Sequence, residues 1–354
     1  MSIPTEPIGS IPRPARLLET IAAFRAGSAD ESLLKDAYSE ALRDTIERFE
    51  QTGSPVISDG EQTKPSFATY PLAGLTNLAP DGVTISFADG HVRQLPRLTS
   101  GPFRYGVHAR SFIKEARRYS SLPMKQAVIS PSALSLLYPA QGIPDYHHDA
   151  FLRDLIDEAA SDIRGALDAG ATNVQIDFTE GRLSLKLDPS GALLRSFVAL
   201  NNQVLEGFSP EDRQHIGVHV CPGGDFGSTH SADVDYALFL PDLFQLNVGR
   251  FYLQLASEPE RKPILGLLSQ LIRPHHLVFV GVINPITATV ETPAQVRDRV
   301  IEAAAYLPIE QLGTTDDCGF SPFADDTSTA RDIAFKKIQA RVEGTQIAAK
   351  EIGL

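Results

Sequence analysis

The sequence predicts an α/β fold, a (β/α)8 TIM barrel formed by a single domain over residues 1–354. Short runs rich in β-branched residues alternate with amphipathic stretches, which is typical of parallel strands connected by helices. Eight such runs occur along the chain, and eight strand–helix units are the number that closes a barrel. A doubly wound sheet is the second choice, because the Gly-rich dinucleotide turn is missing after the first run.

The predicted strands are short apolar runs that end in polar or turn-forming residues. They are Ile8–Pro12, Pro55–Glu61, Met124–Ser130, Asn173–Phe178, Ile216–Cys221, Arg250–Ala256, Leu277–Asn284 and Gln311–Cys318. Apolar residues at helical spacing predict helices in most of the gaps, namely Ala150–Ala169, Gly191–Glu206, Glu258–Ile272, Pro293–Tyr306 and Thr327–Ile347. A capping side chain or a first-turn proline marks two helix starts, at Thr292-Pro293 and at Asp325-Asp326-Thr327.

One segment interrupts this alternation. Residues 63–122 separate the second and third predicted strands and are too long for one helix. The runs Thr84–Phe87 and Val92–Leu95 flank Asp89-Gly90, which predicts a β-hairpin, and His108–Ser120 has the pattern of a helix. We therefore expect a hairpin-plus-helix insertion between strands two and three that covers part of the barrel mouth.

The composition excludes several classes of protein. The chain carries a net charge of −12, whereas a nucleic-acid surface needs clustered Lys and Arg, so no nucleic-acid partner is expected. No apolar run reaches the roughly 18 residues that span a bilayer, and residues 1–14 lack the basic-then-apolar plan of a signal peptide. These features predict a cytoplasmic enzyme with no membrane partner. A homodimer is common among barrels, although nothing in the chain marks an interface.

Reactive side chains are concentrated where predicted strands end, and barrel enzymes place their active sites at the carboxyl ends of their strands. His219 and Cys221 are two positions apart in one strand, so both side chains point to the same face. Cys318, the second of only two cysteines, follows the last strand and can approach the same barrel end. Imidazole and thiolates suit Zn²⁺, and three protein ligands leave a position open for catalysis. The alternative is a packed histidine with two inert thiols.

Several segments together carry a resemblance to a known family. They are Ile8-Gly-Ser-Ile-Pro-Arg13, Asp59-Gly-Glu61, Val174-Gln-Ile-Asp177, Val218-His-Val-Cys221 and Asp317-Cys-Gly319. The chain resembles the catalytic domain of cobalamin-independent methionine synthase, and more closely the short single-barrel relatives of that domain. The matching segments span nearly the whole chain in the family's order, and their combination is far more specific than any one of them.

The resemblance implies a zinc enzyme that transfers a methyl group from a donor such as methyl-folate to homocysteine or a similar small thiol. It implies that zinc is bound by His219, Cys221 and Cys318, and that the amino-acid thiol is held by Ile8, Gly9, Ser10, Glu61 and Asp177. The physical chemistry agrees, because a pair of carboxylates can take the substrate ammonium and backbone amides can take its carboxylate. Zinc would lower the pKa of the thiol and present a thiolate to an electrophilic carbon.

The chain departs from the family pattern in ways that concern the donor. Gln254 occupies the position at the end of the sixth strand where the family commonly has a fourth zinc ligand, a glutamate, and a neutral amide is a poorer ligand. The chain contains no tryptophan for an aromatic folate platform, and Asn284 stands where the family has a histidine thought to move protons. Thiol activation is therefore better supported than the use of methyl-folate.

Some single-barrel relatives resemble epoxyalkane–coenzyme M transferase, which keeps the metal ligands but opens an epoxide. Addition to, or elimination from, an epoxide or other electrophile is therefore the alternative function. Such a reaction needs a proton donor, for which Tyr70, Tyr105, His230 and Glu180 are available. We take Asp177, Glu180 and His230 as the candidate catalytic residues. A further alternative is a metal-free barrel decarboxylase or binding protein, against which the intact histidine and cysteines argue.

Overall fold

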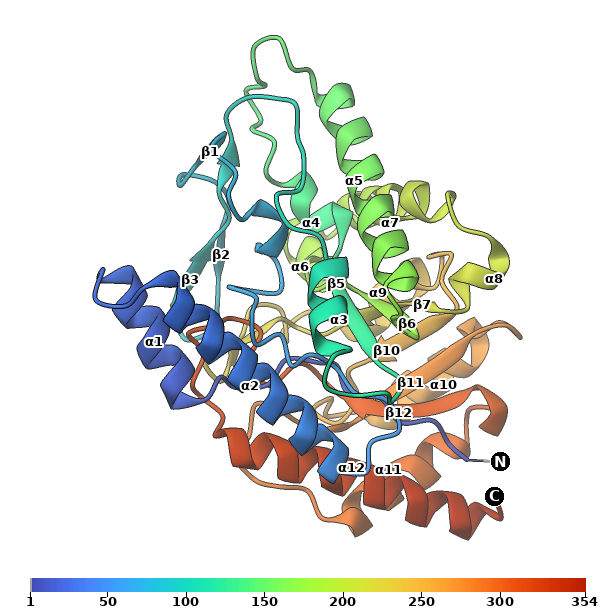
Figure 1. Cartoon of the computed structure of the whole chain (residues 1–354). Helices are drawn as coiled ribbons and strands as arrows, with labels where there is room; N and C mark the ends of the chain where they lie inside the picture. Colours follow the sequence, from blue (N-terminus) through green and yellow to red (C-terminus); the bar gives the residue numbers. More distant parts are fainter. Residues whose placement is uncertain (1) are drawn as a thin grey trace.

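The computed structural model describes residues 2–354 and has an α/β fold, with helices packed around a parallel sheet (Figure 1). Six strands form this sheet in the order β12-β11-β10-β7-β6-β5. They are β5 (Lys125–Ile129), β6 (Asn173–Asp177), β7 (Ile216–Val220), β10 (Arg250–Leu253), β11 (Leu277–Ile283) and β12 (Leu312–Asp316). Almost all of their residues are buried, as expected for a parallel sheet that is covered on both faces. The predicted α/β class is confirmed.

Two further extended segments join the edges of the sheet. Thr5 forms a parallel bridge with β12, and Ile57 forms a parallel bridge next to β5. These two segments also contact each other, because Ser58 Oγ donates to the carbonyl oxygen of Gly9 over 2.8 Å. The six strands and these two segments therefore follow one another in a ring, in the chain order that the sequence predicts.

Helices connect the successive parallel segments. They are α1 (Ala15–Arg25), α2 (Glu31–Gln51), α3 (Arg110–Ala116), α4 (Pro131–Ser135), α5 (His148–Asp168), α6 (Glu180–Leu187), α7 (Ala192–Leu205), α8 (Pro210–Arg213), α9 (Tyr236–Leu243), α10 (Arg261–Leu271), α11 (Pro293–Ala304) and α12 (Arg331–Ile352). The predicted start at Thr292-Pro293 is confirmed, since Thr292 and Gln295 cap α11 reciprocally. The helices α11 and α12 pack side by side below the sheet (Figure 1). Within residues 2–354, no helix combines the length and apolar character of a membrane span.

Short strands extend from the ring near the ends of the sheet strands. They are β1 (Leu78–Ala79) with β4 (Arg97–Leu98), β2 (Thr84–Ser86) with β3 (Val92–Gln94), and β8 (Gly224–Asp225) with β9 (Ser228–Thr229), and each pair is antiparallel. The backbone amide of Ala88, in the β2–β3 turn, donates to the carbonyl oxygen of Thr229 over 2.9 Å. The β2–β3 hairpin thus touches the loop that follows β7. That all of residues 63–122 form an insertion over the barrel mouth stays a prediction.

The prediction of a first strand over Ile8–Pro12 is wrong, because the parallel pairing lies earlier, at Thr5. The apolar run is buried for another reason. Ile8 packs against Tyr252 of β10 and Phe279 of β11, although at this position the chain no longer pairs with the sheet. Buried loop residues and buried strand residues look alike in a sequence, so hydrophobicity placed the strand a few positions too late.

The predicted helix start at Asp325-Asp326-Thr327 is also wrong, since α12 begins at Arg331. The side chain of Asp326 accepts hydrogen bonds from the backbone amide and the hydroxyl of Ser328, at 2.9 and 2.7 Å. Aspartate side chains cap turns as readily as they cap helices. Here Asp326 caps a turn at Ser328, and the helix begins three residues later, at Arg331.

A buried ion pair fixes the last helix to the last strand. Arg341 of α12 pairs with Asp316 at the end of β12, and its Nε donates to Thr5 Oγ1 over 3.1 Å. Neither charged side chain has more than 1% of its surface exposed. Burial raises the pKa of Asp316, and the Arg341 guanidinium opposes that rise. This contact connects α12, β12 and the N-terminal segment.

Replacing Arg341 by methionine leaves the Asp316 carboxyl buried without its partner. We expect the free energy of unfolding, measured with urea, to fall by roughly 3–5 kcal/mol. The matched control is Arg297→Met, which breaks an ion pair with Asp298 that is partly exposed to solvent, and it should cost less than about 1 kcal/mol. Equal losses in the two variants would contradict a structural role for the buried pair.

Candidate metal centre and active site

The site begins with the pairing of β6 and β7. In their parallel register Asp177 is the direct partner of His219, so the two side chains lie side by side at the strand ends. Asp177 Oδ1 lies 3.1 Å from His219 Nδ1, and His219 Nε2 lies 3.3 Å from the carbonyl oxygen of Asp317. Burial lowers the pKa of His219, but hydrogen bonding and charge from Asp177 outweigh burial and raise it overall. The imidazole is therefore fixed in orientation from both ring nitrogens.

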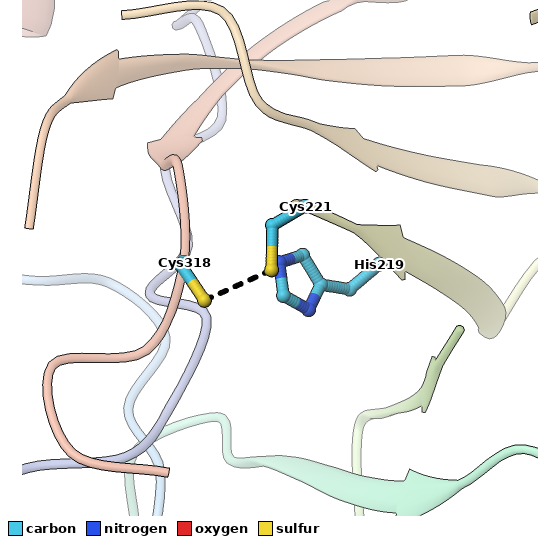
Figure 2. Close-up of side chains that lie close together, drawn as sticks. All are labelled: His219, Cys221 and Cys318. Atoms are coloured by element: carbon cyan, nitrogen blue, oxygen red, sulfur yellow. Dashed lines mark hydrogen bonds between the residues drawn. The ribbon is translucent and has the colours of Figure 1, made fainter. Parts of the chain in front are cut away.

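Both cysteines of the chain reach this histidine. Cys221 directly follows β7, and Cys318 follows β12, 97 positions later; their Sγ atoms are 3.0 Å apart (Figure 2). Both are free thiols and both are buried. The donor atoms of His219, Cys221 and Cys318 all lie within 4.8 Å of one another. The structure thus brings the three predicted ligands together, and two soft sulfurs with one imidazole fit a tetrahedral Zn²⁺ centre.

The Cys318 thiol holds its proton firmly when no cation opposes it. The hydrogen bond with Cys221, together with burial, raises the pKa of the Cys318 thiol well above its ordinary value. A divalent cation would displace thiol protons on binding, because thiolates and not thiols are metal ligands. Metal binding at this cluster should consequently release protons and weaken at low pH.

Gln254, the predicted fourth ligand, is engaged through both ends of its amide. Its Nε2 donates to Ser257 Oγ over 2.8 Å, and its Oε1 accepts from Arg182 Nη1 over 3.2 Å. Arg182 also pairs with Glu258 over 2.7 Å. A carbonyl oxygen that already accepts from a guanidinium is a weaker metal ligand. The ligand role of Gln254 stays a prediction.

A cavity of about 60 Å³ adjoins the cluster and contains most of the predicted substrate residues. Ile8, Ser10, Glu61 and Asp177 all line it, together with His219 and Cys318. Gly9 does not line it; its backbone, with a φ of 149°, turns the chain so that its neighbours do. The predicted segment therefore reaches the site by way of Ile8 and Ser10.

Glu61 is more constrained than the sequence indicates. It is buried with a left-handed φ of 54°, and its Oε1 pairs with Lys64 Nζ over 3.0 Å. Burial raises the pKa of Glu61; Lys64 opposes this rise, while the charges of Asp177 and Asp59 add to it. A substrate ammonium would compete with or complement Lys64 at this carboxylate.

The candidate proton donors differ in position. His230 lines the same cavity, and burial, with the charges of Lys186 and Arg182, lowers its pKa to about 4, so it is neutral at pH 7. Glu180 does not line this cavity and instead lines a neighbouring, larger one. Tyr70 and Tyr105 line neither cavity. The sequence pattern could not separate these four residues, because their distances to the metal ligands depend on loop paths.

Two residues near the site have roles that the sequence did not reveal. Asp317 accepts from the backbone amides of Leu255, Ala256 and Ser257 and so holds the loop after β10. Arg93 of β3 binds Asp225, four positions after Cys221, and lines the cavity. Only the docking of the hairpin against this loop, which has no local signal, brings Arg93 to the site.

The fold and the site define an α/β protein with a buried His-Cys-Cys centre at the ends of its parallel strands. Residues 3–333 match the family described as cobalamin-independent synthase, catalytic domain, and the chain belongs to that family. The methionine synthase of Sulfolobus acidocaldarius is 23% identical over 354 residues, covering 99% of this chain and 93% of the relative. The uncharacterized protein YxjH of Bacillus subtilis is also 23% identical, covering 89% of this chain and 86% of the relative.

Solved structures show the same fold. The B12-independent methionine synthase from Shewanella sp. W3-18-1, in complex with selenomethionine, matches with a TM-score of 0.77 at 20% identity and 99% coverage of both chains. The putative vitamin-B12 independent methionine synthase from Listeria monocytogenes matches with a TM-score of 0.72 at 21% identity and 98% coverage of both.

The close approach of Gly223 to His230 gives a test of the site's packing. A Cβ at Gly223 would lie 1.8 Å from His230 Nε2, whereas a Cβ at Gly227 would meet nothing within 4 Å. Both glycines have a similar positive φ, 70° and 73°. Gly223→Ala should therefore lower the free energy of unfolding by about 1–3 kcal/mol more than Gly227→Ala, as measured with urea. Equal effects would show that His230 is not held against this loop.

Proposed function

We propose that this protein is a zinc-dependent methyltransferase that methylates the sulfur of homocysteine or a similar small thiol. The observation that carries the proposal is the buried cluster of His219, Cys221 and Cys318 beside a cavity lined by two carboxylates. Membership of the cobalamin-independent synthase family supports the same reaction. A zinc ion held there would lower the pKa of the substrate thiol and make it nucleophilic at neutral pH.

The amino-acid end of the substrate would be held by residues of this cavity. Glu61 and Asp177 would accept hydrogen bonds from its ammonium, and the backbone of Ile8, Gly9 and Ser10 would donate to its carboxylate. Asp177 would have a second task, since its hydrogen bond to His219 fixes the imidazole for metal binding. Gln254 would support the centre indirectly, by orienting Arg182 against Glu258.

The alternative, addition of a thiol to an epoxide or related electrophile, has one observation in its favour. Asn284, in place of the family's proton-moving histidine, uses its Oδ1 to accept from the amide of Ile286 over 3.0 Å and does not line the cavity. A proton would then have to come from Glu180, because His230, with its pKa lowered to about 4, is not in its acidic form at neutral pH. The choice between the two reactions concerns the electrophile only and leaves the thiol side unchanged.

The metal centre can be tested by zinc content, because the chain has only two cysteines. Purified protein should contain close to one zinc per chain, and Cys221→Ser or Cys318→Ser should each abolish retention of zinc and thiol alkylation. In wild type both thiols should resist a thiol reagent until a chelator is added. Ser228→Ala, at the half-buried start of β9, is the control and should keep its zinc. Purified wild-type protein without zinc would contradict the proposal and favour a metal-free decarboxylase or binding protein.

The ammonium site predicts a difference between two thiols. Glu61→Gln removes a charge that would pair with the substrate ammonium, a contact worth about 1.5–3 kcal/mol for a hydrogen bond to a charged group. Calorimetry should therefore show roughly tenfold or greater weakening for homocysteine. Binding of 4-mercaptobutyrate, which has no amine, should change little. Equal weakening of both ligands would indicate that Glu61 only maintains the fold through Lys64.

A further inference from the structure

A second and larger cavity lies next to the cavity of the metal centre. It has a volume of about 550 Å³ and opens beside α1, where Ala22 and Arg25 are exposed. The two cavities adjoin each other, since they share five lining residues, Phe67, Ile85, Arg93, Thr179 and Phe323. We call this larger space the outer chamber. It provides a route and a binding volume for a molecule that must meet the activated thiol.

The walls of the outer chamber are mainly apolar. Helix α1 contributes Leu18 and Ile21, and the end of β5 contributes Ile129. Two arginines line the chamber: Arg25 is exposed at the mouth, and Arg93 is already neutralised, because it pairs with Asp225 over 2.6 Å and with Asp325 over 2.9 Å. An uncharged molecule is therefore favoured in the interior of the chamber over a multiply charged one.

Glu180 is a buried carboxyl in this mainly apolar wall. It is only 5% exposed, and its Oε1 accepts from the hydroxyls of Ser130 and Ser132. Asn201 in turn holds Ser132, donating through Nδ2 over 3.0 Å. Within residues 2–354, Glu180 Oε2 is buried and has no hydrogen-bond partner. A carboxyl held this rigidly, with one oxygen unsatisfied, indicates a ligand atom that pairs with it.

We propose that the outer chamber binds the alkyl donor, and that the donor is an uncharged electrophile whose leaving oxygen or nitrogen receives a proton from Glu180. The proposal rests on the thiol alkylation proposed above and names the class of its second substrate. Burial raises the pKa of Glu180 to about 7, so the carboxyl keeps a proton in part of the molecules at neutral pH. That property suits a general acid.

The atoms of this step balance without a further reactant. The thiolate sulfur forms a bond to the donor carbon, and the bond from that carbon to the leaving atom breaks with its electron pair. The leaving atom takes the Glu180 proton, and Glu180 regains a proton from water, while the proton of the substrate thiol is lost to solvent. A sulfonium donor fits poorly, because it would bring a cation into an apolar chamber and its thioether leaving group needs no proton.

The test compares two alkylating probes with homocysteine as the thiol. Propylene oxide needs a proton on its leaving oxygen, whereas methyl iodide releases iodide, which needs none. Glu180→Gln should reduce the rate with propylene oxide by about 100-fold or more relative to its effect with methyl iodide. In wild type, the rate with the epoxide should also fall as the pH rises above about 7, since Glu180 then loses its proton. Zinc content of the variant shows whether the metal centre is intact.

The chamber is tested separately by filling its entrance. Ala22→Trp places a large side chain at the mouth, and Ala15→Trp places the same side chain on an exposed position of the same helix that does not line the chamber. Ala22→Trp should raise the KM for the bulky styrene oxide at least tenfold more than the KM for propylene oxide. Ala15→Trp should leave both KM values and homocysteine binding unchanged.

The outcomes separate the two proposals. If wild type alkylates homocysteine with neither probe, thiol alkylation itself is wrong. If it alkylates with methyl iodide but Glu180→Gln slows both probes equally, or if S-methylmethionine is a better donor than the uncharged probes, the assignment of Glu180 and of the donor class is overturned. If Ala22→Trp affects both epoxides alike, the donor does not enter through the outer chamber.

Discussion

The parallel register of β6 against β7 is the constraint on which the site depends. It makes Asp177 the partner of His219, and because strand side chains alternate, Cys221 is on the same side as His219 two positions later. A slip of one residue would turn these side chains to the opposite face and remove the cluster. Cys318 adds a second requirement. Two strands, β10 and β11, lie between β7 and β12, so the two sulfurs can be 3.0 Å apart only because the sheet curves round.

The local rules of strand geometry predicted the part of the site that lies on strands. Period-two alternation and the rule that barrel chemistry sits at strand ends predicted that His219, Cys221 and Cys318 lie together, and the family resemblance was needed to favour a metal site over packed, inert side chains. The same rules failed at Ile8, whose burial comes from packing against Tyr252 and Phe279 outside any ladder. They could not foresee Arg93 either, because its place depends on how a hairpin docks and no local pattern encodes that docking. The single-domain organisation stays a prediction.

Hydrogen bonding distinguishes the acidic residues around the centre by role. Asp317 is adjacent to Cys318, yet its carboxylate accepts four hydrogen bonds from the loop after β10 and has little capacity left for a ligand. Asp316 is likewise paired with Arg341. Within the described residues, Glu180 and Asp316 each keep one buried oxygen without a partner, but only Glu180 lines a cavity where a ligand could reach that oxygen. Leaving a buried polar atom unsatisfied costs about 1–3 kcal/mol, which a fold tolerates most readily where a ligand makes up the missing bond.

The two cavities are built from different kinds of structure. This difference bears on which part of the site activates the thiol and which part selects the electrophile. The metal centre and its thiol cavity are set largely by strand ends, whose positions follow from the register of the whole sheet. The outer chamber is walled by α1, by the β2–β3 hairpin and by the loop around Phe323. Arg93 connects the hairpin to that loop through Asp325 and to β8 through Asp225. Loops change with little cost to a sheet that is already closed. Under the proposed function, the choice of electrophile can therefore vary through chamber residues while thiol activation is retained, which agrees with a chain that lacks the expected folate residues and still brings His219, Cys221 and Cys318 together.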